Sequence, residues 1–205
     1  MGMENDTLLH FRQTIKHLVD MPTEKIDAVA ELFAKRTYKK NELFSSVEKP
    51  STYLGYIAKG LVRVFAMDRD GNEAILNFRG EYSFTAAFGG IALNNTQPVN
   101  IQALEDSEIY VLERDEFIKI YKTDTDWKDL LNTINEYDSL QLREREISFL
   151  QDDAKKRYSD FMKNFCDIAD RIKLRYVSSY IGVSAETLSR IRSALDCETT
   201  GRVVE

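Results

Sequence analysis

Residues 173–195 read KLRYVSSYIGVSAETLSRIRSAL, and this stretch predicts two short helices separated by a turn. Apolar residues recur at helical spacing from Leu174 to Ile181, and Gly182 then interrupts the pattern. Glycine adopts positive φ at little cost, so it can end the first helix and turn the chain. Ser184 follows as the expected N-cap of a second helix. The second helix places three apolar residues on one face: Leu188, Ile191 and Leu195.

Two short helices around a glycine-containing turn are typical of the helix-turn-helix unit, in which the second helix lies in the major groove of DNA. The polar residues of the second predicted helix lie largely off its apolar face, where a groove would meet them. The alternative interpretation is an ordinary amphipathic helix pair packed within a larger domain.

Charge is unevenly distributed along this chain of 205 residues, whose formal net charge is −6. Residues 171–195 hold five Arg or Lys residues against Glu186 alone, a local net of +4. Because a local basic patch is what engages phosphates, the acidic remainder does not exclude DNA as a partner. It does predict weak non-specific binding that falls steeply with salt.

The overall composition is that of a globular protein with one large or two small domains, since 43% of the residues are hydrophobic and 30% are charged. No apolar run approaches the roughly 20 residues that a membrane-spanning helix needs, so we expect no membrane partner. Polar residues near the N-terminus argue against a secretory signal. The two cysteines, Cys166 and Cys197, form no disulfide framework and no metal motif, which favours a reducing cytoplasm.

The histidine and cysteine content argues against an enzyme. His10 and His17 both lie in a predicted N-terminal helix, outside the β-rich region where a metal-binding barrel would need them. No histidine is expected beside Cys166 or Ser83 to act as a catalytic base, and two distant cysteines cannot hold an iron–sulfur cluster. We therefore expect no catalysis, no metal and no cofactor.

The first part of the chain changes from a helical to a β-like pattern. Helical patterns cover residues 7–21 and resume at Thr23, and short strand-like runs begin after Thr37. Residues 68–71 read as a hairpin turn. The predicted strands are Tyr53–Ala58, Leu61–Met67, Glu73–Phe78, Val99–Leu104 and Glu108–Leu112. Several short strands at this spacing indicate a β-roll or sandwich.

A long helix is predicted from residue 123 to residue 150, because its apolar residues keep a spacing of three or four while its other faces are charged. One small β-roll cannot bury the whole stripe, so a coiled-coil partner is favoured, with a helix lying along its own domain as the alternative. The predicted dimerisation residues are Trp127, Leu130, Leu131, Ile134, Tyr137, Leu140 and Ile147.

The C-terminal stretch resembles the helix-turn-helix of the Crp/Fnr superfamily of bacterial transcription regulators, since residues 182–190 match its Gly-x-Ser-x-Glu-Thr-x-x-Arg core. Residues 56–64, 70–71 and 103–108 resemble the cyclic-nucleotide-binding β-roll that forms the sensor of that family. The resemblance implies an α+β fold in three parts. These are an N-terminal double-stranded β-helix or jelly-roll sensor domain (residues 1–122), a dimerisation helix (123–150) and an all-α helix-turn-helix domain (151–205).

The same resemblance implies a transcription regulator that binds palindromic double-stranded DNA as a homodimer and acts on RNA polymerase. Two recognition helices about 34 Å apart would read successive major grooves. By resemblance, Ala185, Glu186 and Arg190 occupy the base-reading positions. Ala185 stands where the family usually has Arg, so one guanine contact is expected to be missing.

Further DNA contacts, mainly to phosphates, are predicted for Lys173, Arg175, Ser184, Thr187, Ser189 and Arg192. For Arg192, a solvated helix face is the alternative interpretation. Residues 196–205 are too few for the β-hairpin wing that usually follows the recognition helix, so we expect the wing to be short or absent.

The sensor departs from the family at its ligand cassette. Cyclic-nucleotide binders of the family carry Gly-Asp-Phe-Phe-Gly-Glu-Leu-Ala and a later Arg, which hold the ribose and the cyclic phosphate. Here residues 80–87 read GEYSFTAA, so Phe84 replaces the second glycine, Thr85 replaces the Glu, and Gln97 stands in place of the Arg. Burying a phosphate without its cation is costly, so we expect cyclic AMP to bind poorly.

The cassette region is then a candidate pocket for another, unknown small effector, and a filled core without a ligand is the alternative. The candidate pocket residues are Phe78, Arg79, Gly80, Tyr82, Phe84, Thr85 and Gln97. A second hypothesis for the whole chain is a protein-interaction module that keeps this fold without binding DNA.

Overall fold

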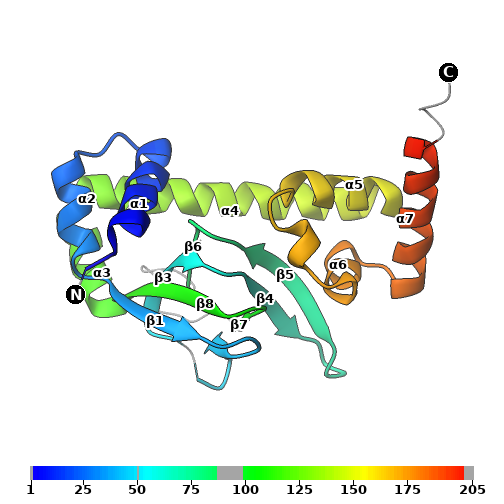
Figure 1. The fold of residues 1–205 in the computed structure, drawn as a ribbon, viewed down its shortest axis with the longest axis horizontal. Helices are drawn as coiled ribbons and strands as arrows, with labels where there is room; N and C mark the ends of the chain where they lie inside the picture. The colour runs from blue at the N-terminus through cyan, green and yellow to red at the C-terminus, as the bar shows by residue number, and fades with distance from the viewer. Residues whose placement is uncertain (1, 50, 87–98, 201–205) are drawn as a thin grey trace.

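The computed structural model describes residues 2–49, 51–86 and 99–200, with side chains described as far as Leu195. Two N-terminal helices, α1 (Asn5–Leu18) and α2 (Thr23–Ala30), lie at one end of the molecule beside a β-roll (Figure 1). The long helix α4 (Thr125–Gln151) follows the short α3 (Arg114–Thr123) and runs along the roll to the opposite end. No described helix is long and apolar enough to cross a membrane.

The β-roll consists of two four-stranded antiparallel sheets. The first has the order β1 (Ala34–Tyr38), β8 (Ser107–Glu113), β3 (Tyr53–Lys59), β6 (Phe84–Thr85). The second has the order β2 (Leu43–Ser45), β7 (Asn100–Ala103), β4 (Val62–Met67), β5 (Glu73–Arg79). The five strands expected from alternation of apolar and polar residues are therefore confirmed, with ends that differ by at most one residue.

Apolar side chains of both sheets fill the space between them. Tyr38 and Phe44, from β1 and β2, pack with ring centroids 5.6 Å apart. They are joined by fully buried aliphatic side chains from the central strands: Ile57, Val62, Ile101, Ala103, Ile109 and Val111. This cluster accounts for the alternating pattern that identified the strands.

The first half of α4 belongs to the chain's own core. Trp127 and Leu130 are 3% and 1% exposed and pack with Phe11 and Ile15 of α1. Leu131 and Ile134 are partly buried against the same cluster. The prediction that Trp127 and Leu130 face a second protomer is wrong, because side chains enclosed within one chain cannot contact another. This half of the helix follows the alternative, a helix lying along its own domain.

The C-terminal helices cover the β5 side of the roll at the far end of α4 (Figure 1). They are α5 (Ala154–Asn164), the single-turn η1 (Ala169–Arg171), α6 (Leu174–Ile181) and α7 (Ala185–Thr200). One apolar cluster joins them to the roll, since Phe65, Ile75 and Phe78 of the second sheet pack with Phe161 and Val177. The C-terminal helices thus pack directly against the β-roll.

Candidate nucleic-acid interface

The turn between α6 and α7 has the geometry that the sequence predicts. Gly182 has φ +69°, the left-handed conformation that ends a helix. A Cβ at this position would lie 2.5 Å from a ring carbon of Phe149 on α4, so space as well as φ requires glycine. The Ser184 hydroxyl accepts a hydrogen bond from the Thr187 amide at 3.1 Å, which confirms the predicted N-cap of α7.

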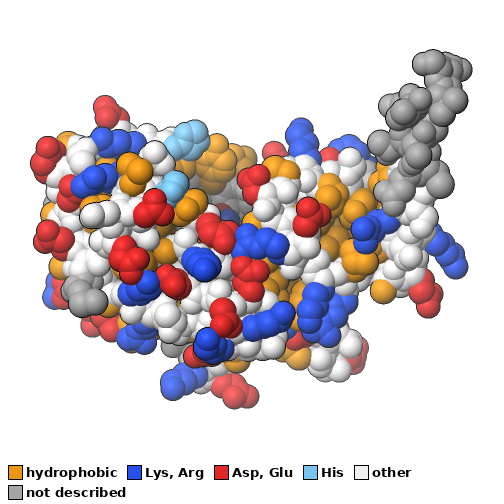
Figure 2. Space-filling view, in the orientation of Figure 1, with side chains coloured by type: hydrophobic (Ala, Val, Ile, Leu, Met, Phe, Trp, Pro, Cys, Tyr) orange, Lys and Arg blue, Asp and Glu red, His pale blue; other side chains and the backbone are white. Residues whose placement is uncertain are grey.

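Helix α7 has one anchored face and one open face. Leu188 is completely buried, and Ile191 and Leu195 are partly buried in the same cluster. The predicted DNA-contacting side chains of α7 are all exposed on the remaining surface, which Figure 2 shows with Lys and Arg side chains around the helix: Ala185, Glu186, Thr187, Ser189, Arg190 and Arg192. Neither arginine forms a hydrogen bond or ion pair with a described side chain, so both guanidinium groups are available to a ligand.

The two basic residues predicted on the preceding helix differ in their surroundings. Lys173 is exposed at the N-cap of α6. Arg175 is also exposed, but its guanidinium donates a hydrogen bond to the Tyr176 hydroxyl at 2.6 Å and lies over that ring. Ser184 is committed to capping α7, and its hydroxyl lies 3.0 Å from that of Thr187. Ser184 therefore has a structural role as the N-cap of α7, in addition to the DNA contact predicted for it.

A second set of arginines, which was not predicted from the sequence, holds the C-terminal helices and the α7 face in position. Arg145 of α4 donates hydrogen bonds to the main-chain oxygens of Ile75 and Leu76 at 3.0 Å and of Tyr180 at 2.8 Å. Burial lowers the pKa of Arg145, because its charge has no carboxylate partner among the described residues. One side chain therefore joins α4, β5 and α6.

Arg171 makes the second connection between the C-terminal helices and the roll. Its guanidinium donates two hydrogen bonds of 2.8 Å to the Glu81 carboxylate and also pairs with Glu105. Burial would raise the pKa of Glu81, but hydrogen bonds from Arg171 and from the Gly60 amide outweigh it and lower that pKa. Glu81 lies in the segment that corresponds to the ligand cassette, so this segment contacts the C-terminal helices directly.

Arg157 and Arg63 complete the set. Arg157 of α5 donates to the main-chain oxygens of Ile181 at 2.8 Å and Asp152 at 2.7 Å, which fixes the turn between α4 and α5. Arg63 is 3% exposed, pairs with Glu73 and lies between the rings of Phe65 and Tyr176.

The signal for Arg145 was present in the sequence, since it lies three helical turns after the inward-facing Ile134.

The candidate effector residues do not line one pocket. Phe78 faces the C-terminal cluster, with ring centroids 6.1 Å from Phe161 and 5.7 Å from Phe165. Phe84 faces the opposite way, towards Phe11 and Tyr56. The apolar pocket expected for the cassette region is therefore not formed by these two side chains, because Phe78 on β5 and Phe84 on β6 point into different clusters.

The remaining cassette residues also have partners of their own. The Arg79 guanidinium donates to Asp138 of α4 at 2.6 Å, and a Cβ on Gly80 would meet Ile168 at 2.8 Å. Tyr82 has φ +62° and stacks on His10 with centroids 3.9 Å apart. Thr85 is buried beside Gly55. The prediction for Gln97 lies outside the described residues.

The described residues contain no group of three or more His, Cys, Asp or Glu side chains placed to hold a metal ion. The residues that the structure brings together are instead an exposed basic helix face, a glycine turn and a set of arginine anchors. Exposed guanidinium groups such as those on the α7 face pair well with anionic groups such as phosphates.

Comparison with known proteins identifies the class of fold. Residues 35–124 match the family model of the cyclic nucleotide-binding domain, which covers the β-roll and α3. Over 82–87% of its length the chain is similar in fold to solved structures of Crp/Fnr-type transcription regulators. The chain has no significant match among curated protein sequences.

Three solved structures define this likeness. FixK2 from Bradyrhizobium japonicum has 19% sequence identity and a TM-score of 0.72, covering 82% of this chain and 86% of that chain. A putative transcriptional regulator of the Crp/Fnr family from Eubacterium rectale has 14% identity and a TM-score of 0.68, covering 87% and 85%. CLP from Xanthomonas campestris, a global regulator described as responsive to c-di-GMP, has 16% identity and a TM-score of 0.64, covering 82% and 88%. The chain shares their fold along most of its length.

Proposed function

We propose that this protein is a sequence-specific DNA-binding transcription regulator of the Crp/Fnr type. The observation that carries the proposal is the open face of α7. There Glu186 and Arg190 are exposed and their side chains have no ion-pair partner among the described residues, while Leu188 is fully buried behind them. An Arg can bond guanine through two hydrogen bonds and a Glu can accept one from the cytosine amino group. The likeness to Crp/Fnr regulators in fold supports the same conclusion.

The second half of α4 supports a homodimer. In contrast to Trp127 and Leu130, the apolar residues Tyr137, Leu140 and Ile147 are each more than half exposed. Figure 2 shows hydrophobic side chains in the hollow between the N-terminal and C-terminal helices. An apolar helix stripe of this kind is stabilised by a second copy in a coiled coil. Pairing would place two α7 helices to read a palindromic operator, where the dimer acts on RNA polymerase.

The sensor is proposed to work without cyclic AMP. The Arg79 cation, the one nearest the cassette in sequence, is already paired with Asp138. Phe84 and Thr85, which replace the second glycine and the Glu of the cassette, are packed into the protein rather than open to a sugar. A nucleotide phosphate would therefore lose its water without gaining these partners.

DNA binding is tested by fluorescence anisotropy with a labelled duplex from the region upstream of the protein's own gene and a random duplex of equal length, at one fixed salt concentration. We expect Arg190→Ala to lose about 1–3 kcal/mol on the preferred site and much less on random DNA. Arg69→Ala is the matched control, because Arg69 is exposed in the turn between β4 and β5 and lies outside α7.

Equal losses on the two duplexes would show that Arg190 contacts phosphate rather than a base. If the unchanged protein bound no duplex from the upstream region more tightly than the random duplex, the interaction-module hypothesis would be favoured instead.

A further inference from the structure

Helix α6 carries α7 and is attached to the rest of the protein at both of its ends. Leu188 of α7 is buried in one cluster with Val177 and Ile181 of α6, so the orientation of α7 follows that of α6. The exposed face of α7 is therefore presented in whatever orientation α6 takes on the β-roll. Since α6 has eight residues, its two ends lie about 12 Å apart along the helix axis.

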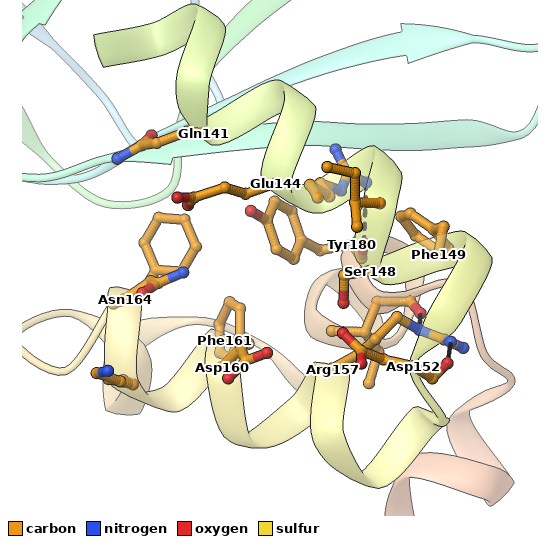
Figure 3. A pocket seen from close by; sticks show the side chains of 15 residues that line it. Gln141, Glu144, Ser148, Phe149, Asp152, Arg157, Asp160, Phe161, Asn164 and Tyr180 are labelled. Atoms are coloured by element: carbon orange, nitrogen blue, oxygen red, sulfur yellow. Dashed lines mark hydrogen bonds between the residues drawn. The ribbon is translucent and has the colours of Figure 1, made fainter.

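The C-terminal end of α6 is attached by hydrogen bonds to the main chain. The Ser179 hydroxyl donates to the main-chain oxygen of Glu73 at 3.0 Å and accepts from the amide of Ile75 at 3.2 Å. Arg145 and Arg157 donate to the main-chain oxygens of the last two residues of the helix. Figure 3 shows Arg157 at the turn where α4 meets α5. This end of α6 is thus fixed to β5, α4 and α5 together.

The N-terminal end of α6 is attached through the guanidinium of Arg171, which lies three residues before the helix begins. Arg171 donates two hydrogen bonds of 2.8 Å to the carboxylate of Glu81. It also pairs with Glu105, with a further hydrogen bond of 3.4 Å to that carboxylate. The two carboxylates come from different turns of the roll, one between β5 and β6 and the other between β7 and β8. A fork of donors held by two acceptors fixes direction as well as distance.

Both carboxylates are themselves held in place by the roll. The amide of Gly60 donates to the Glu81 carboxylate at 2.9 Å. A Cβ on Gly60 would lie 2.2 Å from the hydroxyl oxygen of Ser107, and this hydroxyl donates to the main-chain oxygen of Glu105 at 2.8 Å. The acceptors of Arg171 are therefore preorganised by the roll.

The apolar contacts beside this network do not fix a direction by themselves. Ile168 packs on Gly80, where a Cβ would meet it at 2.8 Å, and Ile172 is buried in the cluster under α6. Hydrophobic burial is non-directional, so such contacts tolerate a small rotation of the helix. A rotation would, however, pull the Arg171 guanidinium away from its carboxylates.

The network is strong enough to matter although it is not fully buried. The side chains of Arg171, Glu81 and Glu105 are 27–36% exposed. Isolated ion pairs at the surface contribute little, but bidentate pairs and networks of several charges are the exceptions. This network has both properties, since Arg171 binds Glu81 through two nitrogens and binds a second carboxylate as well.

We propose that Arg171 is a positioning residue for the α7 face: its pair with Glu81 and Glu105 sets the orientation in which α6 and α7 are held on the roll. Without this pair, the two helices stay attached at the C-terminal end of α6 and pivot about it. The consequence for DNA rests on the function proposed above. A dimer recognises one spacing of half-sites only if both α7 helices are presented in one orientation, so a pivot relaxes the spacing that it accepts.

The test compares duplexes that differ in half-site spacing. In the upstream duplex that binds most tightly, one base pair is added or removed between the half-sites, which rotates one half-site by about 34° relative to the other. We expect the unchanged protein to lose at least about tenfold in affinity on the altered spacings, and Arg171→Gln at most about threefold. The ratio is the readout, because the loss of one positive charge weakens binding to all these duplexes alike.

Two further variants separate the pair from its charge. Glu81→Gln breaks the same pair while it changes the net charge in the opposite sense, and it should relax the spacing in the same direction as Arg171→Gln. Arg171→Lys keeps the charge without the fork and should give an intermediate ratio. Lys39→Gln is the matched control, because Lys39 pairs with Asp106 within the roll, and it should keep the full spacing preference.

Hydrogen–deuterium exchange of the full chain, followed by mass spectrometry, gives a second readout without DNA. The peptide that covers α6 should exchange at least about threefold faster in Arg171→Gln and Glu81→Gln than in the unchanged protein or Lys39→Gln. A spacing preference that Arg171→Gln retains, unaltered exchange of α6, or a uniform rise in all peptides would overturn the proposal. If the unchanged protein itself shows no spacing preference, the proposed function fails, and the exchange of α6 alone decides whether Arg171 positions the helices.

Discussion

Two groups of arginines lie in and around the C-terminal helices, and their surroundings differ. Arg190 and Arg192 stand on the open face of α7 with no described side chain as partner. Arg145, Arg157 and Arg171 are each held by two or three main-chain oxygens or carboxylates from other segments. The same residue type thus serves as an anchor where acceptors surround it and as a candidate ligand-binding group where none do.

Because of this difference, fewer positive charges are free in residues 171–195 than the sequence count of +4 suggests. Counting by sequence, Arg171 contributes to the +4 of residues 171–195, but its charge is compensated by Glu81 and Glu105. Arg175 is turned onto Tyr176. In the proposed DNA complex the free positive charge therefore comes mainly from Lys173, Arg190 and Arg192. We accordingly expect few phosphate contacts and a modest salt dependence, in place of the steep one expected from the charge count of the sequence.

The largest effect is expected from removing the Arg145 anchor. Arg145→Met keeps much of the side-chain length but leaves three main-chain oxygens without their donor, so we expect a loss of about 2–4 kcal/mol in the free energy of unfolding. Urea unfolding followed by circular dichroism measures it. Arg143→Met, at an exposed position two residues earlier, should change stability by less than about 0.5 kcal/mol. Equal losses would mean that Arg145 is no anchor.

A smaller and pH-dependent effect is expected at Glu81. Its pKa is lower in the folded chain than in the unfolded one, so its stabilisation is complete above the unfolded-state value, about 4.3, and is lost as pH falls through the folded-state pKa. Glu81→Gln should cost about 1 kcal/mol at pH 7, because the pair with Arg171 is only partly buried. The difference from the unchanged protein should shrink as the pH is lowered.

Urea unfolding of both proteins at several pH values follows this difference. Glu48→Gln, on the exposed loop after β2, is the control and should show no difference at any pH. A gap between the Glu81→Gln and unchanged proteins that stays constant down to acidic pH would contradict a role for the ionised carboxylate.

The smallest effect is expected at Arg192. Replacing it with alanine should weaken binding by about 0.5 kcal/mol on preferred and random DNA alike, and should lower the salt slope by about one. Anisotropy titrations across a salt series provide the measurement. A loss confined to the preferred duplex would instead make Arg192 a base-reading residue, and no loss on either duplex would leave it as a solvated side chain.

Local features of the C-terminal helices were predictable because they depend on neighbouring residues. The positive φ of Gly182 and the cap at Ser184 each follow from a few residues of sequence. The five predicted strands followed from alternation, and the helix predicted over residues 123–150 matches α4 within two residues at each end.

The partners of these elements were less predictable, because periodicity fixes which face of a helix is apolar and not what covers it. Trp127 and Ile147 belong to one stripe in the sequence, yet the first is buried against α1 and the second is exposed. Phe78 was assigned to an effector pocket, but its strand turns it towards α5. Arg145 lies in a run of alternating charges, a pattern typical of a solvated helix face, but in the structure its guanidinium donates hydrogen bonds to β5 and α6.

The most direct test of the account is a hydroxyl-radical footprint of the full chain on the DNA upstream of its own gene. A dimer that reads DNA through two α7 helices should protect two related sequences centred about 10 base pairs apart. Protection should weaken with Arg190→Ala and persist with Arg69→Ala, the exposed control outside α7. A single protected stretch, or protection without sequence preference, would contradict the account.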